Sequence, residues 1–412
     1  MDPLGLYQIA DQLAVMLVPA VRERMQRIRF LTAMAVGAMV TEGMEEAPQF
    51  RDASPYLVWE WLVVEAIVRT SSNGSSVQGV PGSDMARRAL QQHNYLDARS
   101  YLKNPRIFGF NGVYKRLAVH LKLLDVNLGP GPRTEELFAA WARDLRIGSR
   151  EEAKSLVQRW SAAVRRSLGE KPPRTKTNWT NREWTELAVA FAPEGAQGWE
   201  KSCLREALLA ADDRKLGALP ALWRLQSEFD DKEFREEPMH VMLQGREPVY
   251  GSLLTAIRNY ETFSRNLKDA FDLLKAVAAG QKTQGFLVIE IARDEKFNRC
   301  VEDLHEQFMD ADSALGEVGL VGSSLRNTFS ERFSRFAEPM DAGSCGLALC
   351  AHHEAVQQAK SADGKRPWFD RIGTDRIYIR HAYREPRQPI QPGRYVHGYR
   401  GWPIRRFYRD LK

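Results

Sequence analysis

The stretch that decides the fold is YGSLLTAIRNYETFSRNLKDAFDLLKAVAAG, which runs from Tyr250 to Gly280. Its apolar side chains recur every three or four residues, the spacing that places them on one face of an α-helix. They are Leu254, Ile257, Phe263, Leu267, Phe271 and Leu274. Gly280 follows the last of these turns, and glycine is typical of the position that ends a helix. We therefore predict one long amphipathic helix whose apolar face lies in a protein core.

Similar apolar stripes lie on both sides of this helix in the sequence. Residues 286–308 continue the pattern as a second predicted helix, and residues 329–336 form a third that ends before Pro339. Earlier in the chain, residues 6–44 predict one or two helices and residues 150–168 predict another. We therefore expect a mainly α, multi-domain protein with a central helical bundle.

Breaks in the helical pattern predict three domains. Gly129-Pro130-Gly131-Pro132 is a strong break, and it predicts the end of a first helical domain at residues 1–132. Residues 133–345 then form the bundle, and residues 346–412 form a small basic, aromatic-rich region. Within that region Arg376 to Arg380 alternates in the manner of a strand, and Gly, Pro and Arg elsewhere predict short strands and extended chain.

The composition excludes several classes of protein. Hydrophobic residues make up 43% and charged residues 27% of the 412 residues, which is typical of a chain that folds around a core. Four cysteines are too few for a disulfide framework. The apolar stretches at 31–40 and 57–68 are shorter than the ~20 residues that span a bilayer, and residues 1–7 lack the features of a secretory signal. We expect a cytoplasmic protein with no membrane partner.

Positive charge is concentrated towards the C-terminal end of the sequence. Residues 360–412 contain 14 Lys and Arg against 5 Asp and Glu, a net charge of +9. The whole chain carries +6, so residues 1–359 carry −3. Nine aromatic residues share the same stretch. Arginine binds phosphate oxygens and an aromatic ring stacks on a base, so this combination is typical of a nucleic-acid surface.

The predicted contacts in this C-terminal region are Lys365, Trp368, Arg394, Tyr395, Tyr399, Arg400, Trp402, Arg405 and Arg406. The prediction requires that the cations lie open to phosphates. The alternative is a segment that packs over the bundle, with its aromatic side chains buried and its arginines paired with the protein's own carboxylates.

A second candidate surface lies at residues 104–121. A turn at Asn104-Pro105 precedes a predicted helix that starts at Gly112 and carries its apolar side chains on one face, at Val113, Leu117 and Leu121. Helix, turn, helix is the outline of a helix-turn-helix or winged-helix unit, in which Asn111, Lys115 and Arg116 would point towards a groove or a phosphate. The alternative is an ordinary pair of antiparallel helices.

A cluster of cations, Arg22, Arg24, Arg27 and Arg29, follows the first predicted helix. Runs of like charge most often form a solvated face, so we interpret the cluster as a solvated surface or a contact between domains. Contact with phosphates is the alternative.

The segment Cys345-Gly-Leu-Ala-Leu-Cys350-Ala-His352-His353-Glu354 holds two cysteines and two histidines. A zinc site usually combines two short pairs of ligands separated by a longer loop, and this segment has no second half. His353 and Glu354 are candidate catalytic residues of a metal-dependent nuclease, with Lys360 or Lys365 nearby as a phosphate clamp. The alternative is a buried histidine with a structural role.

Other catalytic and cofactor motifs are missing from the sequence. Gly280-Gln281-Lys282-Thr283 lacks the spacing of a phosphate loop, and no Gly-x-Ser-x-Gly nucleophile motif occurs. Glu290 has no lysine two residues further on, as a common nuclease core requires. We therefore expect no cofactor, and a binding protein rather than an enzyme.

Three scattered pieces of the chain are notable together. They are Leu4-Gly-Leu with Leu17-Val-Pro-Ala-Val-Arg-Glu-Arg, then Pro105-Arg-Ile-Phe-Gly-Phe-Asn-Gly-Val-Tyr, and then His352-His-Glu-Ala-Val-Gln with Lys365-Arg-Pro-Trp-Phe. In these pieces the chain resembles uncharacterised proteins encoded in bacterial phage-defence gene clusters. The resemblance implies a context, in which such a protein accompanies a helicase, a nuclease or a methylase, and it carries over no catalytic residue.

These patterns favour a nucleic-acid-binding accessory component of a bacterial anti-phage defence or restriction-like system. DNA is expected as the ligand in preference to RNA, with other defence proteins as partners. Two alternatives remain: a metal-dependent nuclease that uses the cluster at 350–354, and a protein-interaction scaffold of a multi-subunit complex.

Overall fold

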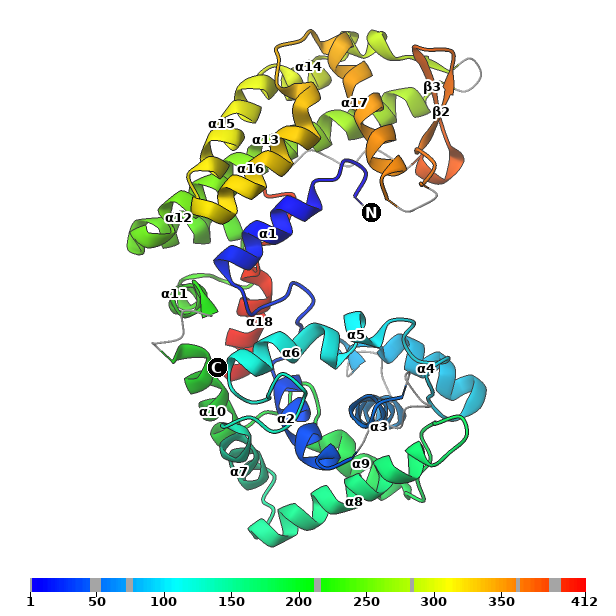
Figure 1. Ribbon diagram of the computed structural model, residues 1–412, viewed down its shortest axis with the longest axis vertical. Coiled ribbons are helices and arrows are strands. Elements are labelled where there is room, and N and C mark those ends of the chain that lie inside the picture. The colour runs from blue at the N-terminus through cyan, green and yellow to red at the C-terminus, as the bar shows by residue number, and fades with distance from the viewer. Residues whose placement is uncertain are drawn as a thin grey trace. The chain divides into compact units, whose positions relative to one another are not determined.

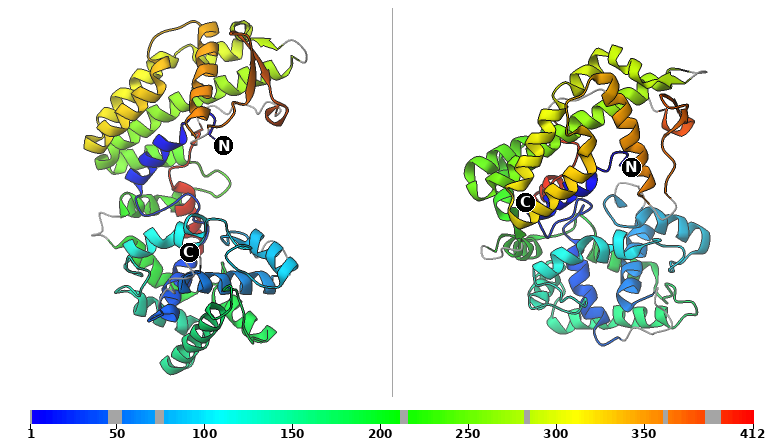
Figure 2. Two further views of the ribbon diagram at one scale, coloured as in Figure 1. Left: turned by 45° about the vertical axis from the view of Figure 1, so that its right-hand side comes forward. Right: turned by 45° about the horizontal axis from the view of Figure 1, so that its top comes forward.

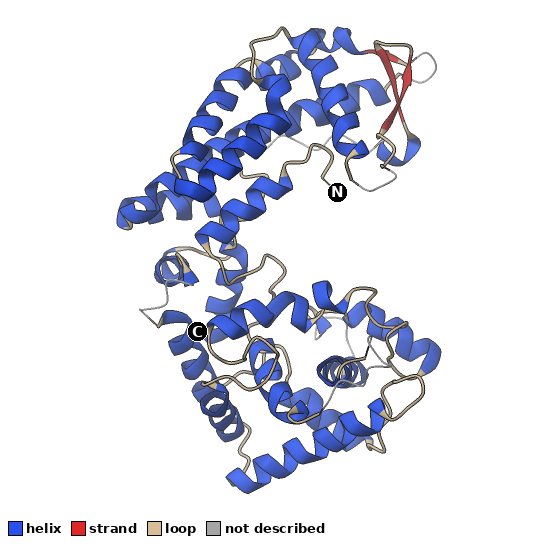
Figure 3. Cartoon of the chain, in the orientation of Figure 1, coloured by secondary structure: helices blue, strands red, loops and turns tan. Residues whose placement is uncertain are grey.

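The computed structural model describes residues 2–44, 53–71, 77–210, 216–281, 285–360, 364–384 and 394–412. This part of the chain is mainly helical and contains one small antiparallel sheet (Figures 1 and 3). The predicted mainly α class is therefore confirmed. The chain divides into two compact units: the first unit is Met1–Leu17 with Ser227–Tyr399, and the second unit is Val18–Gln226 with Arg400–Lys412.

These two units differ from the three domains predicted at 1–132, 133–345 and 346–412. The predicted break at Gly129–Pro132 lies inside the second unit, because the loop there turns the chain back on itself. Gly131 N–H donates to Leu123 O and Arg133 N–H donates to Lys122 O. A Cβ on Gly131 would lie 2.4 Å from Lys122 O, so glycine permits this close approach. The next helix consequently packs on the same core.

The first unit is built around the long helix α13, which confirms the helix predicted from Tyr250 to Gly280. Its helices are α1 (Tyr7–Leu17), α12 (Glu236–Arg246), α13 (Gly251–Ala279), α14 (Glu295–Val301), α15 (Leu304–Gly316), α16 (Gly319–Phe333) and α17 (Ala342–Gln358), with 3-10 turns at Pro248–Tyr250, Val288–Arg293, Ser334–Phe336 and His381–Tyr383. A further 3-10 turn, Gln226–Glu228, begins at the last residue of the second unit before the chain enters the first. Helices α13, α15 and α16 pack side by side (Figures 1 and 2). Their shared core holds buried phenylalanines in ring contact, among them Phe263, Phe308 and Phe329.

Residues 286–308 do not form the single helix predicted for them. They form β1 (Phe286–Leu287), the 3-10 turn, α14 and the start of α15. The strand is held by tertiary pairing, because β1 joins β3 (Arg376–Ile379) in the three-stranded order β1-β3-β2, with β2 at Phe369–Ile372. The strand predicted from Arg376 to Arg380 is confirmed, and both neighbours of β3 run antiparallel to it.

The second unit packs its helices around α2 and α3. The helices are α2 (Phe30–Thr41), α3 (Pro55–Thr70), α4 (Ser83–His93), α5 (Pro105–Phe108), α6 (Phe110–His120), α7 (Thr134–Asp144), α8 (Arg150–Leu168), α9 (Asn181–Ala190), α10 (Gly198–Leu209), α11 (Leu219–Leu225) and α18 (Gly401–Leu411). Helix α2 is apolar on nearly every face and is buried, as expected of a central helix. Ring contacts among Trp59, Trp141, Trp160 and Phe191 join its neighbours α3, α7 and α8 to the residue that follows α9.

The end of the chain forms a helix, so the extended chain predicted there is wrong for residues 401–411. Three apolar side chains of α18, Ile404, Phe407 and Leu411, recur at helical spacing and are buried. The helix packs on α10 and α11 within the second unit. Among the described residues, no helix is long and apolar enough to cross a bilayer.

Candidate nucleic-acid interface

Helices α5 and α6 form a tight corner in the second unit. A Cβ on Gly112 would lie 2.3 Å from the carbonyl carbon of Ile107, so only glycine allows the two helices to approach this closely. Glu60 of α3 anchors this corner, because its buried carboxylate accepts the N–H of Phe110 at 3.0 Å. Burial raises the pKa of Glu60 to about 7. The corner thus consists of the short helix α5, Gly109 and the longer helix α6, where the sequence predicted a turn at Asn104-Pro105 and a helix from Gly112.

One face of α6 is buried and the other is polar. Val113, Leu117 and Leu121 are buried as predicted, although the helix begins at Phe110 and ends one residue before Leu121. Asn111 and Lys115 lie one turn apart on the other face, and Arg116 follows. The same corner carries exposed Arg106.

A second segment of chain is fastened beside this polar face. The buried hydroxyl of Tyr114 accepts the N–H of Gln26 at 3.0 Å and of Arg27 at 3.1 Å. From the other side, Arg116 Nη1 donates to Pro19 O at 3.4 Å. These bonds hold residues 19–27 against α6 and bring the exposed Arg22 into its neighbourhood.

The two segments together enclose a groove of about 430 Å³, which we call the basic groove. It is lined by Arg22, Arg106, Asn111, Gly112, Lys115, Arg116, Val119, His120 and Val126. Four of these residues are permanently cationic and, among the described residues that line the groove, none is acidic. Such a cavity concentrates positive potential and suits an anion such as a phosphate diester.

The arginine cluster at residues 22–29 serves three different purposes. Arg22 lines the groove, whereas Arg24 lies 4.5 Å over the ring of Phe108. Arg27 forms ion pairs with Glu194 and Asp410. Arg29 is buried 3.3 Å from Glu200, and desolvation lowers its pKa. The phosphate alternative therefore stays open for Arg22, while Arg27 and Arg29 act in the protein's own structure.

The C-terminal segment, in contrast, is held by the protein's own carboxylates. Tyr399 is fully buried, and its hydroxyl donates to Glu261 at 2.7 Å. The backbone N–H groups of Tyr395 and Tyr399 donate to Glu237 and Glu236. The prediction that these rings present open stacking faces is therefore wrong for Tyr399, and Tyr395 is half-buried.

Two of the predicted arginine contacts are also buried. Arg400 is 3% exposed and lies 3.9 Å from Glu23, and Arg405 is 6% exposed and donates to the carbonyl oxygen of Gln226. These guanidinium groups are not open to phosphates, so the prediction is wrong for both. Arg406 is half-buried, and Trp402 keeps 40% of its surface exposed.

The remaining predicted contacts lie in the first unit. Trp368 stacks on Tyr383 with a centroid separation of 4.8 Å and is half-buried. Lys365 and Arg394 are exposed. The sequence-predicted contacts are therefore divided between the two units: Lys115 and Arg116 share the basic groove of the second unit, and the others belong partly to each unit.

The histidine pair has a structural role. His353 is fully buried; its Nδ1 bonds Pro3 O at 2.9 Å, and its Nε2 accepts the N–H of Trp368 at 3.0 Å. With both ring nitrogens engaged by backbone, burial lowers the pKa of His353 to about 4. His352 Nε2 bonds Leu4 O at 2.8 Å, and Glu354 forms an ion pair with Arg371. This geometry leaves His353 and Glu354 unsuited to the nuclease chemistry considered from the sequence.

The cysteines of the same helix are equally unsuited to bind a metal. Cys345 and Cys350 are buried, and desolvation raises the pKa of each thiol to about 12. A metal ligand or nucleophile requires the thiolate. Among the described residues, no group of three or more His, Cys, Asp or Glu side chains is placed to hold a metal ion.

The pieces that carry the resemblance gather in two places. In the first unit, Leu4 and Trp368 bond to the histidine pair of α17. In the second unit, residues 18–24 and 105–114 meet at the basic groove. The sequence patterns did not identify Arg106 or Glu60 as residues of the site. Pro105 before Arg106 and the glycines after it indicate a tight turn, and this was the feature that could have drawn attention to Arg106. No family model, curated protein or solved structure matches the chain.

Proposed function

We propose that the protein binds nucleic acid through the basic groove of its second unit. The observation that carries this proposal is the lining of the groove, in which four permanent cations from two separate segments meet without an acidic neighbour among the described lining residues. Some arginines elsewhere in the described chain pair with carboxylates, as Arg371 does with Glu354.

The chemistry of the groove suits a phosphate backbone. Arginine offers a planar fork of donors that matches two phosphate oxygens, and lysine adds a point charge. Asn111 lies on the same face of α6 and is the residue type that reads adenine in a major groove. Duplex DNA is therefore the expected ligand in preference to RNA, whose major groove is too narrow for a helix.

The cellular context remains a proposal drawn from the resemblance. The protein would act as an accessory component of a bacterial anti-phage defence or restriction-like system, binding DNA while another subunit performs the chemistry. Purification of the protein with its neighbouring gene products, before and after nuclease treatment, tests this. Partners that remain after the nuclease treatment would instead favour the scaffold alternative.

The groove is tested by measuring binding to a labelled duplex over a salt series. For each phosphate contact, the logarithm of the affinity falls with the logarithm of the salt concentration with a slope of about 0.9. Lys115→Ala combined with Arg116→Ala removes two contacts, so the slope should fall by about 2 and the affinity at about 0.1 M salt by about 50-fold.

The matched control replaces two arginines on the exposed face of α8, Arg165→Ala with Arg166→Ala. This variant loses the same charge from the same unit but leaves the groove lining intact. We expect wild-type affinity within about threefold. An equal loss in both variants would mean that net charge alone drives binding, and the groove would be abandoned.

A further inference from the structure

A second cavity adjoins the basic groove in the same unit. It has a volume of about 520 Å³ and is lined by Ser54, Tyr56, Leu57, Glu60 and Trp61 of α3 and its N-cap, by residues 98 and 101–106, and by Asn111. Arg106 and Asn111 line both cavities, so the two open into the same corner of α5 and α6. The volume lies within the range of small-molecule sites, roughly 300–1,000 Å³.

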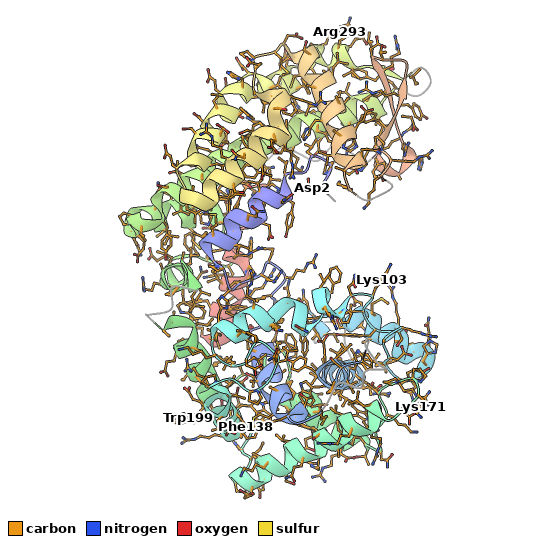
Figure 4. The ribbon with its side chains drawn as sticks, viewed as in Figure 1. Asp2, Lys103, Phe138, Lys171, Trp199 and Arg293 are labelled. Carbon is orange, nitrogen blue, oxygen red and sulfur yellow. The ribbon has the colours of Figure 1, made fainter. Side chains whose placement is uncertain are left out.

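The outer wall of this cavity is a structured loop. Asp97 Oδ1 accepts the N–H groups of Arg99 and Ser100 at 3.0 and 2.7 Å. This turn directs Tyr101 inward, where its hydroxyl donates to Glu60 at 2.8 Å. The ring of Tyr101 lies against Gly82, whose φ of +76° and missing side chain make room for it. At the rim, Lys103 and Arg106 are exposed, and Figure 4 shows Lys103 extending from the surface beside α5.

Buried polar atoms along this cavity lack partners. The Tyr56 hydroxyl and the Trp61 Nε1–H have no hydrogen-bond partner in the described part of the chain, and these side chains are 5% and 0% exposed. A buried polar group without a partner costs roughly 1–3 kcal/mol, and native proteins contain few of them. Two on adjacent turns of α3, both lining one cavity, point to a ligand that satisfies them.

We propose that this cavity holds the base of an unpaired nucleotide whose phosphate lies against Arg106 at the junction with the basic groove. The assignment rests on the proposed function, because it names the part of the bound nucleic acid that enters the second unit. A base fits the lining: it is flat, it carries both donors and acceptors on its edge, and aromatic walls favour it.

Different residues around the cavity would bind the base and the phosphate. Tyr56 and Trp61 supply donors to the ring nitrogens or exocyclic oxygens of a base. The cations at the rim, Lys103 and Arg106, neutralise the phosphate. The shared chemistry is that of a nucleoside monophosphate, which reaches the cavity either as part of a strand or as the free molecule.

The test compares a blunt duplex with the same duplex carrying a short single-stranded overhang. Wild-type protein should bind the overhang duplex about tenfold more tightly, the effect of one stacked base. Tyr56→Phe removes only the hydroxyl, and Ala98→Trp narrows the mouth from its exposed wall. Both variants should lose the preference and still bind the blunt duplex like wild type.

Thermal unfolding of the free protein separates binding from folding. Because Tyr56 has no partner for its hydroxyl, Tyr56→Phe should leave the melting temperature unchanged or raise it, while it weakens binding. Tyr7→Phe removes the hydroxyl of an exposed tyrosine in the first unit and serves as the matched control, with the overhang preference retained.

A second arm uses a nucleoside 5′-monophosphate alone. A thermal shift that Tyr56→Phe abolishes assigns the free nucleotide as a source of the ligand, and an overhang preference without such a shift assigns the strand. The inference is overturned if wild type shows neither effect, or if Tyr56→Phe and Ala98→Trp keep both. Salt-dependent binding of the blunt duplex through Lys115 and Arg116 would then still support the basic groove. Failure of the cavity assignment is therefore distinguishable from failure of the proposed function.

Discussion

Two regions of this protein combine basic and aromatic residues, and the structure treats them in opposite ways. In the C-terminal segment, carboxylates of α12 and α13 hold Tyr395 and Tyr399, and Arg400 and Arg405 are buried. At the α5–α6 corner, four cations surround a groove in which no described lining residue is acidic. In the region with the higher charge in the sequence, two of the predicted arginine contacts, Arg400 and Arg405, are buried within the protein.

The difference shows that net charge along a sequence does not measure charge available to a ligand. An arginine contributes to binding only if it is exposed and its nearest anion is the ligand. In the C-terminal segment, Arg400 is buried near Glu23 and Arg405 is buried against the carbonyl oxygen of Gln226, so neither is open to a phosphate. In the groove, none of the described lining residues is acidic.

The largest expected effect tests whether the C-terminal segment is held internally. Glu261 is buried and accepts hydrogen bonds from His397 Nδ1 at 2.6 Å, from the Tyr399 hydroxyl at 2.7 Å and from two backbone N–H groups. Glu261→Ala would leave these donors buried without a partner, at a cost of roughly 3–5 kcal/mol. Urea unfolding measures the loss.

The control is Glu331→Ala, which removes an exposed carboxylate from α16 in the same unit and should change the free energy of unfolding by less than about 0.5 kcal/mol. If Glu261→Ala proved as mild as the control, the C-terminal segment would not depend on Glu261, and its arginines and rings would again be candidates for binding.

The next effect concerns the carboxylate beneath the groove. Because the pKa of Glu60 is raised to about 7 in the folded state and is near 4.5 otherwise, the native protein binds more protons than the unfolded chain between these values. Its contribution to stability is therefore present at low pH and is lost as the pH rises through 7, a change of roughly 3 kcal/mol. Comparison of wild type with Glu60→Gln from pH 4.5 to 8 isolates this change. An unaltered difference between the two proteins across that range would contradict the buried, neutral carboxyl group.

A smaller effect tests the corner itself. A Cβ on Gly112 would collide with the backbone of α5, at 2.3 Å from Ile107 and 2.5 Å from Arg106 O, so Gly112→Ala should cost roughly 1–3 kcal/mol and weaken duplex binding. Gly245 in α12 meets no atom within 4 Å, and Gly245→Ala should instead stabilise by up to about 1 kcal/mol. Equal changes in melting temperature for the two variants would remove the packing argument.

The sequence predicts the local elements better than their assembly. The stripe from Leu254 to Leu274 and the helix at residues 150–168 are confirmed, because helical periodicity depends on near neighbours. The division into units could not be read in the same way, since the chain passes between the two units three times, after Leu17, Gln226 and Tyr399. A glycine-proline loop marks a turn and does not reveal whether the next helix joins the same core.

The candidate site was partly predictable for the same reason. Asn111, Lys115 and Arg116 share one face of a helix and follow from periodicity alone. Arg22 lies beside them because the hydroxyl of Tyr114 accepts the N–H groups of Arg27 and Gln26. These two residues are 87 and 88 positions away from Tyr114 in the sequence. No local pattern distinguishes Arg22 from Arg29, which is buried beside Glu200.

The most direct measurement compares the contributions of the two basic regions to duplex binding in one assay. Two double variants each lose one exposed or half-exposed lysine and one exposed arginine: Lys115→Ala with Arg116→Ala in the groove, and Lys365→Ala with Arg394→Ala in the C-terminal region. Duplex binding is measured over a salt series for both and for wild type. We predict that the groove variant loses about 2 from the salt slope while the C-terminal variant keeps the wild-type slope. A loss confined to the C-terminal variant would contradict the assignment of the groove.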